Sequence, residues 1–170
     1  MKKIISLLVI LFVIASCEET PEITFEKDGV LVTSPRGWKI TDEENFDDQG
    51  YYLSIEKDGF DSSGLVAITW IKSELDLIEW LNIIKDEMKD NLVYKNSNLS
   101  FGNQNKNKFN DINTTSVTFT SNILGLKHEG IIHVFHENGN TFEILLQEAL
   151  EDKTDNKNGF ELIEQSFKIR

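Results

Sequence analysis

Residues 127–150 read KHEGIIHVFHENGNTFEILLQEAL, and this stretch decides the fold. Two runs rich in apolar and β-branched residues, Lys127–His136 and Thr141–Leu150, have the composition of β-strands. The four residues between them include Asn138-Gly139, a dipeptide that favours the primed turns of tight hairpins. The stretch therefore predicts two long antiparallel strands that pair with each other.

Further strand-like runs lie upstream of this hairpin. We predict a third strong strand at 112–121 and a weak edge strand in 99–109 that gives way to a loop. An acidic loop is expected at 42–50. Turn signals separate four shorter runs, which predict an antiparallel meander: Ile23–Glu26, Val30–Thr33, Tyr51–Glu56 and Leu65–Ile71.

Two segments change to the helical period. Between Ser73 and about Asn91 one apolar stripe recurs, with Ser73 expected to cap the helix and Asp76 to complete a near capping box. A short carboxy-terminal helix is predicted from Phe160, after the polar stretch 151–159. The predicted fold class is α+β, an antiparallel sheet of about six to seven strands packed between helices. The apolar stripe of the first helix consists of Leu77, Leu81, Ile84 and Met88, and that of the second consists of Phe160, Ile163 and Phe167.

The amino terminus has the three parts of an export signal. Two lysines precede an apolar stretch from Ile4 to Ala15, and small residues lead to the lone cysteine, Cys17. As a helix the stretch would cover only ~18 Å, too short for ~30 Å of bilayer hydrocarbon. We therefore predict a signal peptide at 1–16, an acidic tether at 17–22 and one domain at 23–170.

Ile14-Ala15-Ser16-Cys17 resembles the lipobox of bacterial lipoproteins. The resemblance implies that Cys17 is the lipidation site, carrying a diacylglycerol thioether, and that the protein is exported and lipid-anchored in the bacterial cell envelope. The membrane is then reached through the lipid on Cys17. The acidic residues that follow are similar to those that direct some Bacteroidota lipoproteins to the surface, so both the periplasmic and the surface side stay open.

Charge narrows the range of partners. Without the two leader lysines, 15 of the 17 basic residues and all 29 acidic residues remain, a formal charge of −14. Such a balance argues against nucleic acid and against electrostatic adhesion to anionic lipids. With Cys17 acylated, the domain has no thiol for disulfides, nucleophilic catalysis or cysteine metal sites.

The order of these elements resembles the PsbP-like family. The likeness rests on a strand ending in Ser34-Pro35-Arg36-Gly37-Trp38, the helix at 73–91, the Asn138-Gly139 hairpin and the ending 160–167 with Gln165-Ser166-Phe167. It covers residues 23–170 and implies a PsbP-like α/β/α sandwich. Its motifs are structural, so they carry over no site residue.

Candidate functional residues are few. His128 and His136 share a strand face but lie ~26 Å apart, and His133 points the other way, so we expect no shared metal. The segment from Thr154 to Gly159 resembles a calcium loop but lacks its acidic ends, Thr154 and Gln165 standing at those positions. The acidic run is expected to be a solvated loop; its members are Asp42, Glu43, Glu44, Asp47 and Asp48. A group of aromatic residues at periodic apolar positions is expected to lie in the core; its members are Trp70, Trp80, Phe119, Phe135 and Phe142.

The sequence contains no nucleophile elbow, phosphate loop, dinucleotide fingerprint or paired-histidine zinc helix. We therefore predict no cofactor and no metal, and favour a non-enzymatic module that binds an envelope protein or supports an assembly. Two alternatives stay open: a carrier of a small apolar ligand, and an envelope hydrolase that uses carboxylates.

Overall fold

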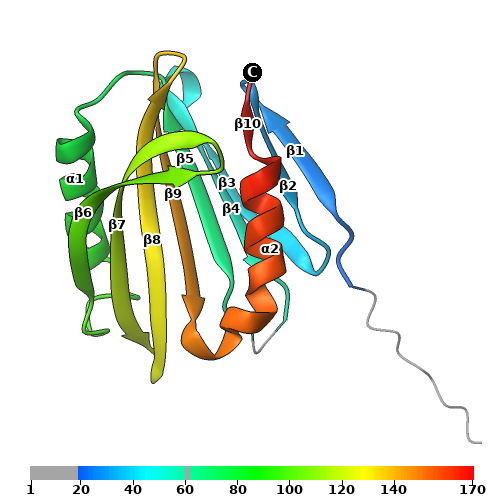
Figure 1. The fold of residues 1–170 in the computed structure, drawn as a ribbon, viewed down its shortest axis with the longest axis vertical. Coiled ribbons are helices and arrows are strands. Elements are labelled where there is room, and N and C mark those ends of the chain that lie inside the picture. Colours follow the sequence, from blue (N-terminus) through cyan, green and yellow to red (C-terminus); the bar gives the residue numbers. More distant parts are fainter. Residues whose placement is uncertain (1–18, 60–61) are drawn as a thin grey trace, which may run out of the picture.

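The computed structural model describes residues 19–59 and 62–170. Its centre is a seven-stranded antiparallel sheet, which confirms the predicted fold class (Figure 1). Across the sheet the strands run in the order β3 (Trp38–Asn45), β4 (Gly50–Lys57), β5 (Leu65–Ile71), β9 (Asn140–Ala149), β8 (Leu126–Glu137), β7 (Ile112–Ile123) and β6 (Ser100–Phe109).

The predicted hairpin is the β8–β9 pair. Glu137 pairs with Asn140, so Asn138 and Gly139 alone form the turn, with φ values of 51° and 78°. Two positive φ values in succession are those of a type I′ turn, whose twist matches the flanking strands. Phe135 and Phe142 face each other across this pair, with ring centroids 5.1 Å apart and nearly parallel planes.

A second sheet of three strands was not predicted. It contains β1 (Ile23–Lys27), β2 (Val30–Ser34) and the short C-terminal β10 (Lys168–Ile169), which pairs with β2. The first two strands of the expected meander therefore lie outside the main sheet, and only β3, β4 and β5 form a meander within it. The cause is a partner at the far end of the chain, beyond the reach of local patterns.

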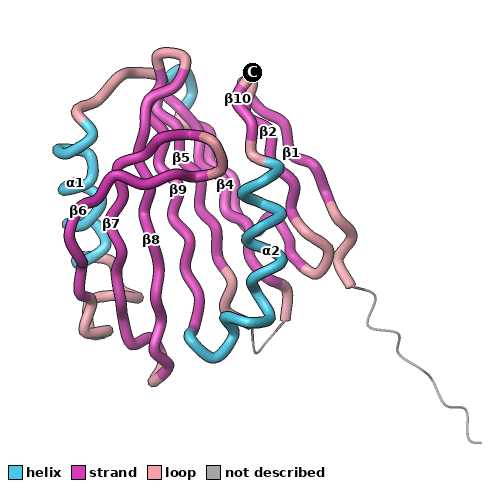
Figure 2. Tube along the Cα trace, viewed as in Figure 1, coloured by secondary structure: helices cyan, strands magenta, loops and turns pink. Residues whose placement is uncertain are grey.

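The two faces of the main sheet are covered differently (Figure 2). On one face, α1 (Leu77–Asp90) buries its apolar stripe against β7, β8 and β9, with Leu81 fully buried. On the other face lie α2 (Lys153–Ser166) and the three-stranded sheet, whose core contains Ile163 and Phe167. Among the described residues, neither helix has the length and apolar composition needed to span a membrane.

Both helices begin elsewhere than predicted. Asp76, not Ser73, caps α1, because its carboxylate accepts hydrogen bonds of 2.9 Å from the amides of Ile78 and Glu79. Helix α2 begins at Lys153, so most of the polar stretch 151–159 is helical and Phe167 is the residue that ends the helix. Its first turns bury Asn156 and Gly159, which carry no apolar signal.

Two predicted loops are strands for much of their length. Residues 42–45 continue β3, and a short 3₁₀ turn, η1 (Asp47–Gln49), follows. The expected edge strand β6 runs on to Phe109, and the β6–β7 hairpin curls over the α2 face (Figure 1). Phe109, near its tip, packs edge-on against Phe167, 5.6 Å between ring centroids. The tip is thus folded back onto the core through the buried ring of Phe109.

Trp38 packs between α2 and the edge of the sheet. Its indole is 3% exposed and lies between two glycines: a Cβ added at Gly64 would be 2.4 Å from the ring, and one at Gly159 would be 2.5 Å from it. Phe160 meets the same ring edge-on, with centroids 5.3 Å apart. The Pro-Arg-Gly-Trp corner predicted from the sequence therefore fixes where the helix sits.

Candidate functional site

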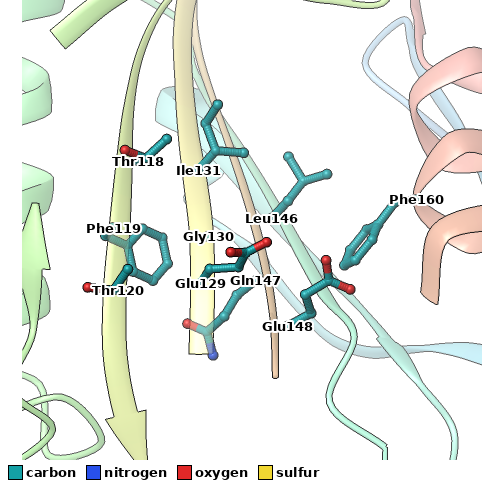
Figure 3. A pocket seen from close by; sticks show the side chains of 10 residues that line it. All are labelled: Thr118, Phe119, Thr120, Glu129, Gly130, Ile131, Leu146, Gln147, Glu148 and Phe160. Atoms are coloured by element: carbon teal, nitrogen blue, oxygen red, sulfur yellow. The ribbon is translucent and has the colours of Figure 1, made fainter. Parts of the chain in front are cut away.

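A concave surface with an apolar lining, which we call the groove, lies between α2 and the part of the sheet that α2 leaves uncovered (Figure 3). It has a volume of about 490 Å³ and is open to solvent. Ile131 and Leu146 form an apolar floor, and Phe160 projects from the helix as one wall (Figure 3). The full lining is Thr118, Phe119, Thr120, Glu129, Gly130, Ile131, Leu146, Gln147, Glu148 and Phe160.

Two carboxylates give the groove its polarity. Glu129 on β8 and Glu148 on β9 are register partners and face the same side of the sheet. Each has a partner from the start of α2: Lys153 forms an ion pair with Glu129, and the Asn156 amide donates to Glu148 over 3.1 Å. Partial burial raises the pKa of Glu148, with Glu129 adding to the effect. A cation is therefore the group that this rim would accept most readily.

Phe119 and Gly130 shape the sheet behind the groove. They are register partners on β7 and β8, and a Cβ at Gly130 would lie 2.3 Å from the Phe119 ring. The ring therefore occupies the space that a side chain at position 130 would need. Sequence reasoning missed this contact; the signal that could have indicated it is an isolated glycine inside a strand pattern, which marks a close approach of neighbouring groups.

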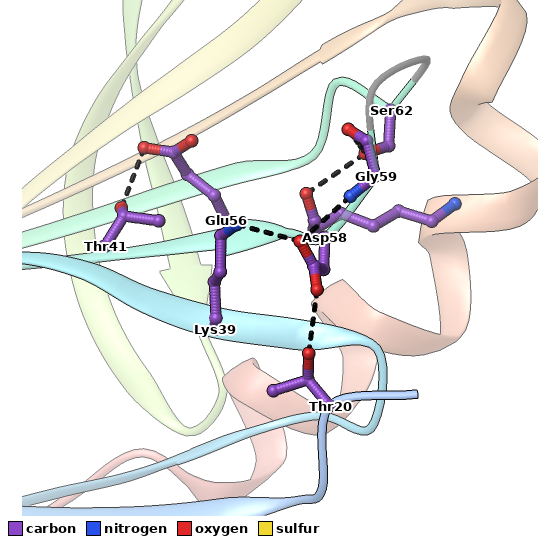
Figure 4. Close-up of polar contacts among 8 residues, drawn as sticks. Thr20, Lys39, Thr41, Glu56, Asp58, Gly59 and Ser62 are labelled. Carbon is purple, nitrogen blue, oxygen red and sulfur yellow. Dashed lines mark hydrogen bonds and ion pairs between the residues drawn. The ribbon is translucent and has the colours of Figure 1, made fainter. Parts of the chain in front are cut away.

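The predicted lipidation site, Cys17, lies outside the described residues. The described end of the tether is attached to the domain: the Gly37 amide donates to the Thr20 carbonyl, and the Thr20 hydroxyl donates to Asp58 over 2.9 Å (Figure 4). Lys39 also donates to Asp58, and this hydrogen bond is the main cause that lowers the pKa of the Asp58 carboxyl. The chain therefore enters the domain at a defined place, beside the turn between β2 and β3.

The structure separates the three histidines. His128 and His136 face α1, where His136 Nε2 lies 2.7 Å from the Leu75 carbonyl oxygen. His133 faces the other side and lies 2.9 Å from the Thr114 hydroxyl, packed against Phe109. Burial lowers the pKa of His133 to about 4. These contacts give His133 and His136 structural partners at separate places.

The segment 154–159, expected to be a polar loop although its sequence resembles a calcium loop, is helical and forms the first turns of α2. The acidic run is also not a single loop, and one of its members, Glu43, accepts a hydrogen bond from the Tyr51 hydroxyl. That bond is the main reason that the pKa of Tyr51 rises to about 12. Within the described residues no three histidine, cysteine or acidic side chains are grouped to hold a metal ion.

Four of the five aromatic residues expected in the core are buried, and Trp80 is half-buried against α1's side of the sheet. The residue that sequence reasoning missed is Glu143, at the middle of β9. Burial, and then the nearby charge of Glu87, raise the pKa of Glu143 to about 7. The signal that would have found it is a single acid within the apolar run Phe142–Leu146.

The opposite pKa shifts of His133 and Glu143 predict an unusual pH dependence. Below pH 6.5 the unfolded chain protonates His133 but the folded one does not, so His133 destabilises the fold as pH falls towards 4. Glu143 takes up its proton more readily in the folded state, so stability is lost as pH rises from 4.5 to 7. The two effects oppose each other around pH 5–6.

As the pH falls from 7 to 5, we expect the free energy of unfolding of Glu143→Gln to fall by about 2 kcal/mol relative to that of the wild type. Over the same pH change, the free energy of unfolding of His133→Gln should rise by a similar amount relative to the wild type. Urea unfolding of each variant at both pH values measures the difference. The expectation is contradicted when both variants follow the wild-type pH dependence.

No protein-family model matches the sequence, and a search of curated proteins finds no match. Two solved structures are similar over most of the chain. One is LpqN, described as involved in cell envelope biogenesis of Mycobacterium tuberculosis: TM-score 0.52, 12% identity, covering 88% of this chain and 90% of LpqN. The other is the cyanobacterial PsbP protein CyanoP of Synechocystis sp. PCC 6803: TM-score 0.54, 16% identity, covering 92% and 95%. These likenesses show that the domain has a PsbP-like fold.

Proposed function

We propose that this protein is a lipid-anchored, non-enzymatic module of a bacterial cell envelope that binds a partner protein through the groove beside α2. The anchor is supported by the export signal and by the lipobox resemblance at Cys17. An envelope role is supported by the shared fold with LpqN, which is described as involved in cell envelope biogenesis. The groove supplies the binding surface.

The observation that carries the proposal is the chemistry of the groove. An apolar floor lies beside two carboxylates, so the fitting occupant is a protein segment that presents an apolar side chain next to a lysine or arginine. Glu129 and Glu148 already hold Lys153 and Asn156, a pattern suited to binding a cation and less suited to proton transfer. The strongly acidic composition of the chain favours the same kind of partner.

The test is affinity capture from detergent-solubilised envelopes with the acylated full-length protein as bait. The wild type should enrich one partner, and the double variant Glu129→Gln with Glu148→Gln should capture about tenfold less of it, because the partner's cation loses its two carboxylates. The matched control is Glu44→Gln with Glu137→Gln, which removes the same charge from exposed positions at the opposite end of the sheet.

Several results would contradict the proposal. Equal loss of capture in both double variants would place the effect in net charge rather than in the groove. An apolar molecule that co-purifies in the groove, detected by native mass spectrometry, would make the protein a carrier. The anchor is tested by Cys17→Ser, which should abolish acylation and leave the protein out of the mature membrane fraction; a variant that stays acylated and anchored would refute that part.

A further inference from the structure

The turn between β7 and β8 has a residue that the fold itself does not explain. Leu124 is 98% exposed and adopts a φ of 52°, a conformation that disfavours branched and bulky side chains. The other non-glycine residues with positive φ in the described chain are all asparagine or aspartate. Leu124 therefore carries both an unfavourable backbone conformation and an apolar side chain in water. Such an exception indicates that the side chain of Leu124 contacts something other than its own domain.

Leu124 belongs to a group of exposed apolar side chains at one end of the sheet. Of the eight large apolar residues that are exposed in the described chain, six lie at this end, which we call the leucine end. Leu92 is 87% exposed, a fraction that only Leu124 exceeds within the group. The leucine end consists of Ile23, Leu92, Val93, Leu124, Leu126 and Leu150.

Strand register places these residues at the same end of the fold. Ile123 pairs with Leu126 at the β7–β8 turn, and His128 pairs with Ala149, so Leu150 follows β9 at the same end. The segment after α1 lies there too, because the Asn122 amide donates to the Ser97 carbonyl. Figure 1 shows the β7–β8 turn, the last residues of β9 and the C-terminal end of α1 at the lower end of the molecule.

The chain enters the domain from the same end. Ile23 pairs with Ser34 at the end of β2, and Thr20 is hydrogen-bonded to the turn that follows β2. Trp38, after that turn, pairs with Lys57 at the end of β4, so this entry point lies at the same end of the strands as the β7–β8 turn, on the opposite side of the sheet. Cys17 is two residues before Glu19, a reach of at most ~7 Å.

We propose that the leucine end contacts the lipid bilayer and orients the anchored domain on it. This inference rests on the lipid anchor of the proposed function. The anchor holds this end close to the membrane, where exposed leucines on loop tips gain a favourable apolar environment that the domain does not provide. The bilayer is therefore a second contact besides the acyl chains.

The charges near the leucine end indicate that it contacts the hydrocarbon boundary of the bilayer and not anionic lipid headgroups. Its loops expose both basic residues, Lys95 and Lys127, and acidic residues, Asp90 and Glu151. Mixed charges give no net attraction to acidic lipids. Vesicles of uncharged phosphatidylcholine are therefore sufficient to test the contact.

The test compares two turns of the same geometry at opposite ends of the sheet. Leu124-Gly125 has φ values of 52° and 88°, and Asn138-Gly139 has 51° and 78°. Leu124→Cys and Asn138→Cys are each labelled with a polarity-sensitive dye in the acylated full-length protein, bound to phosphatidylcholine vesicles. At position 124 we expect roughly twofold quenching by lipids with an acyl-chain nitroxide and protection from aqueous iodide. At position 138 we expect iodide quenching only.

A second measurement uses Leu124→Asn, which suits the positive φ and so preserves the fold. It should speed transfer of the acylated protein between vesicles by about tenfold, because one buried leucine contact is lost. Unchanged transfer would count against the contact.

The outcomes separate the two proposals. A dye at position 124 that stays open to iodide on vesicle-bound protein overturns the bilayer contact and leaves the anchor intact. Dye reaction with Cys17 in the wild type, together with no vesicle binding, refutes the anchor instead. Protection at position 124 in native envelope membranes but not in protein-free vesicles would assign the leucine end to a protein partner and overturn the bilayer contact.

Discussion

Trp38→Ala is expected to lower the free energy of unfolding by about 3–5 kcal/mol, the range typical of a large aromatic residue removed from a core. The indole is almost fully buried and is enclosed by Gly64, Gly159 and Phe160, so its removal leaves a cavity at the junction of α2 and the sheet. Glycine neighbours have no side chains that could move in to fill it. Urea denaturation at pH 7 measures the loss.

Trp80→Ala is the matched control for Trp38→Ala. Trp80 is half-buried on α1, so the same substitution there should cost clearly less, about 1–2 kcal/mol. The expectation fails when the two variants lose equal stability. Because Phe160 contacts Trp38 and also forms a wall of the groove, Trp38→Ala should weaken partner capture as well.

Gly130→Ala is the second change with a large expected effect, a loss of about 2–4 kcal/mol from one added methyl group. The new Cβ would lie 2.3 Å from the Phe119 ring and 2.5 Å from the Leu146 carbonyl oxygen. The ring is held within the core of the α1 face, and the carbonyl belongs to the neighbouring strand, so neither contact is relieved by a simple side-chain rotation.

Gly125→Ala provides the comparison for Gly130→Ala. A Cβ at Gly125 meets nothing within 4 Å, so only its positive φ of 88° opposes the substitution, a cost of about 1 kcal/mol. Thermal or urea unfolding of both variants separates steric overlap from backbone strain. Adding Phe119→Leu to Gly130→Ala should recover part of the loss, and full recovery would show that the Leu146 carbonyl contributes nothing.

Local patterns were sufficient for the elements whose reason is local. The Asn138-Gly139 turn and the stripe of α1 were predicted because each depends on residues a few positions apart. The prediction of Ser73 as the N-cap of α1 was wrong because Ser73 and Asp76 are both residue types that cap helices, and only the path of the backbone decides between them. Helix α2 was predicted too short because its first turns bury Asn156 and Gly159 and not an apolar stripe.

Long-range contacts account for what the sequence did not predict. Strand β10 has two residues, too few for a strand pattern, and its partner β2 lies more than a hundred residues earlier in the chain. The groove needs β8, β9 and α2 together, and no single segment contains its chemistry. The lipidation of Cys17 stays a prediction, and it rests on a different kind of signal, a linear motif that does not depend on packing.

The pairing of β10 with β2 determines when the small sheet is completed. Lys168 and Ile169 pair with Leu31 and Val30, so this sheet lacks a strand until almost the whole chain is available. If the chain is exported from its amino terminus, as proposed, β1 and β2 cross the membrane before the residues of β10 that complete their sheet. Such late closure suits a chain that must remain unfolded during translocation, because non-local pairing of this kind makes folding slow.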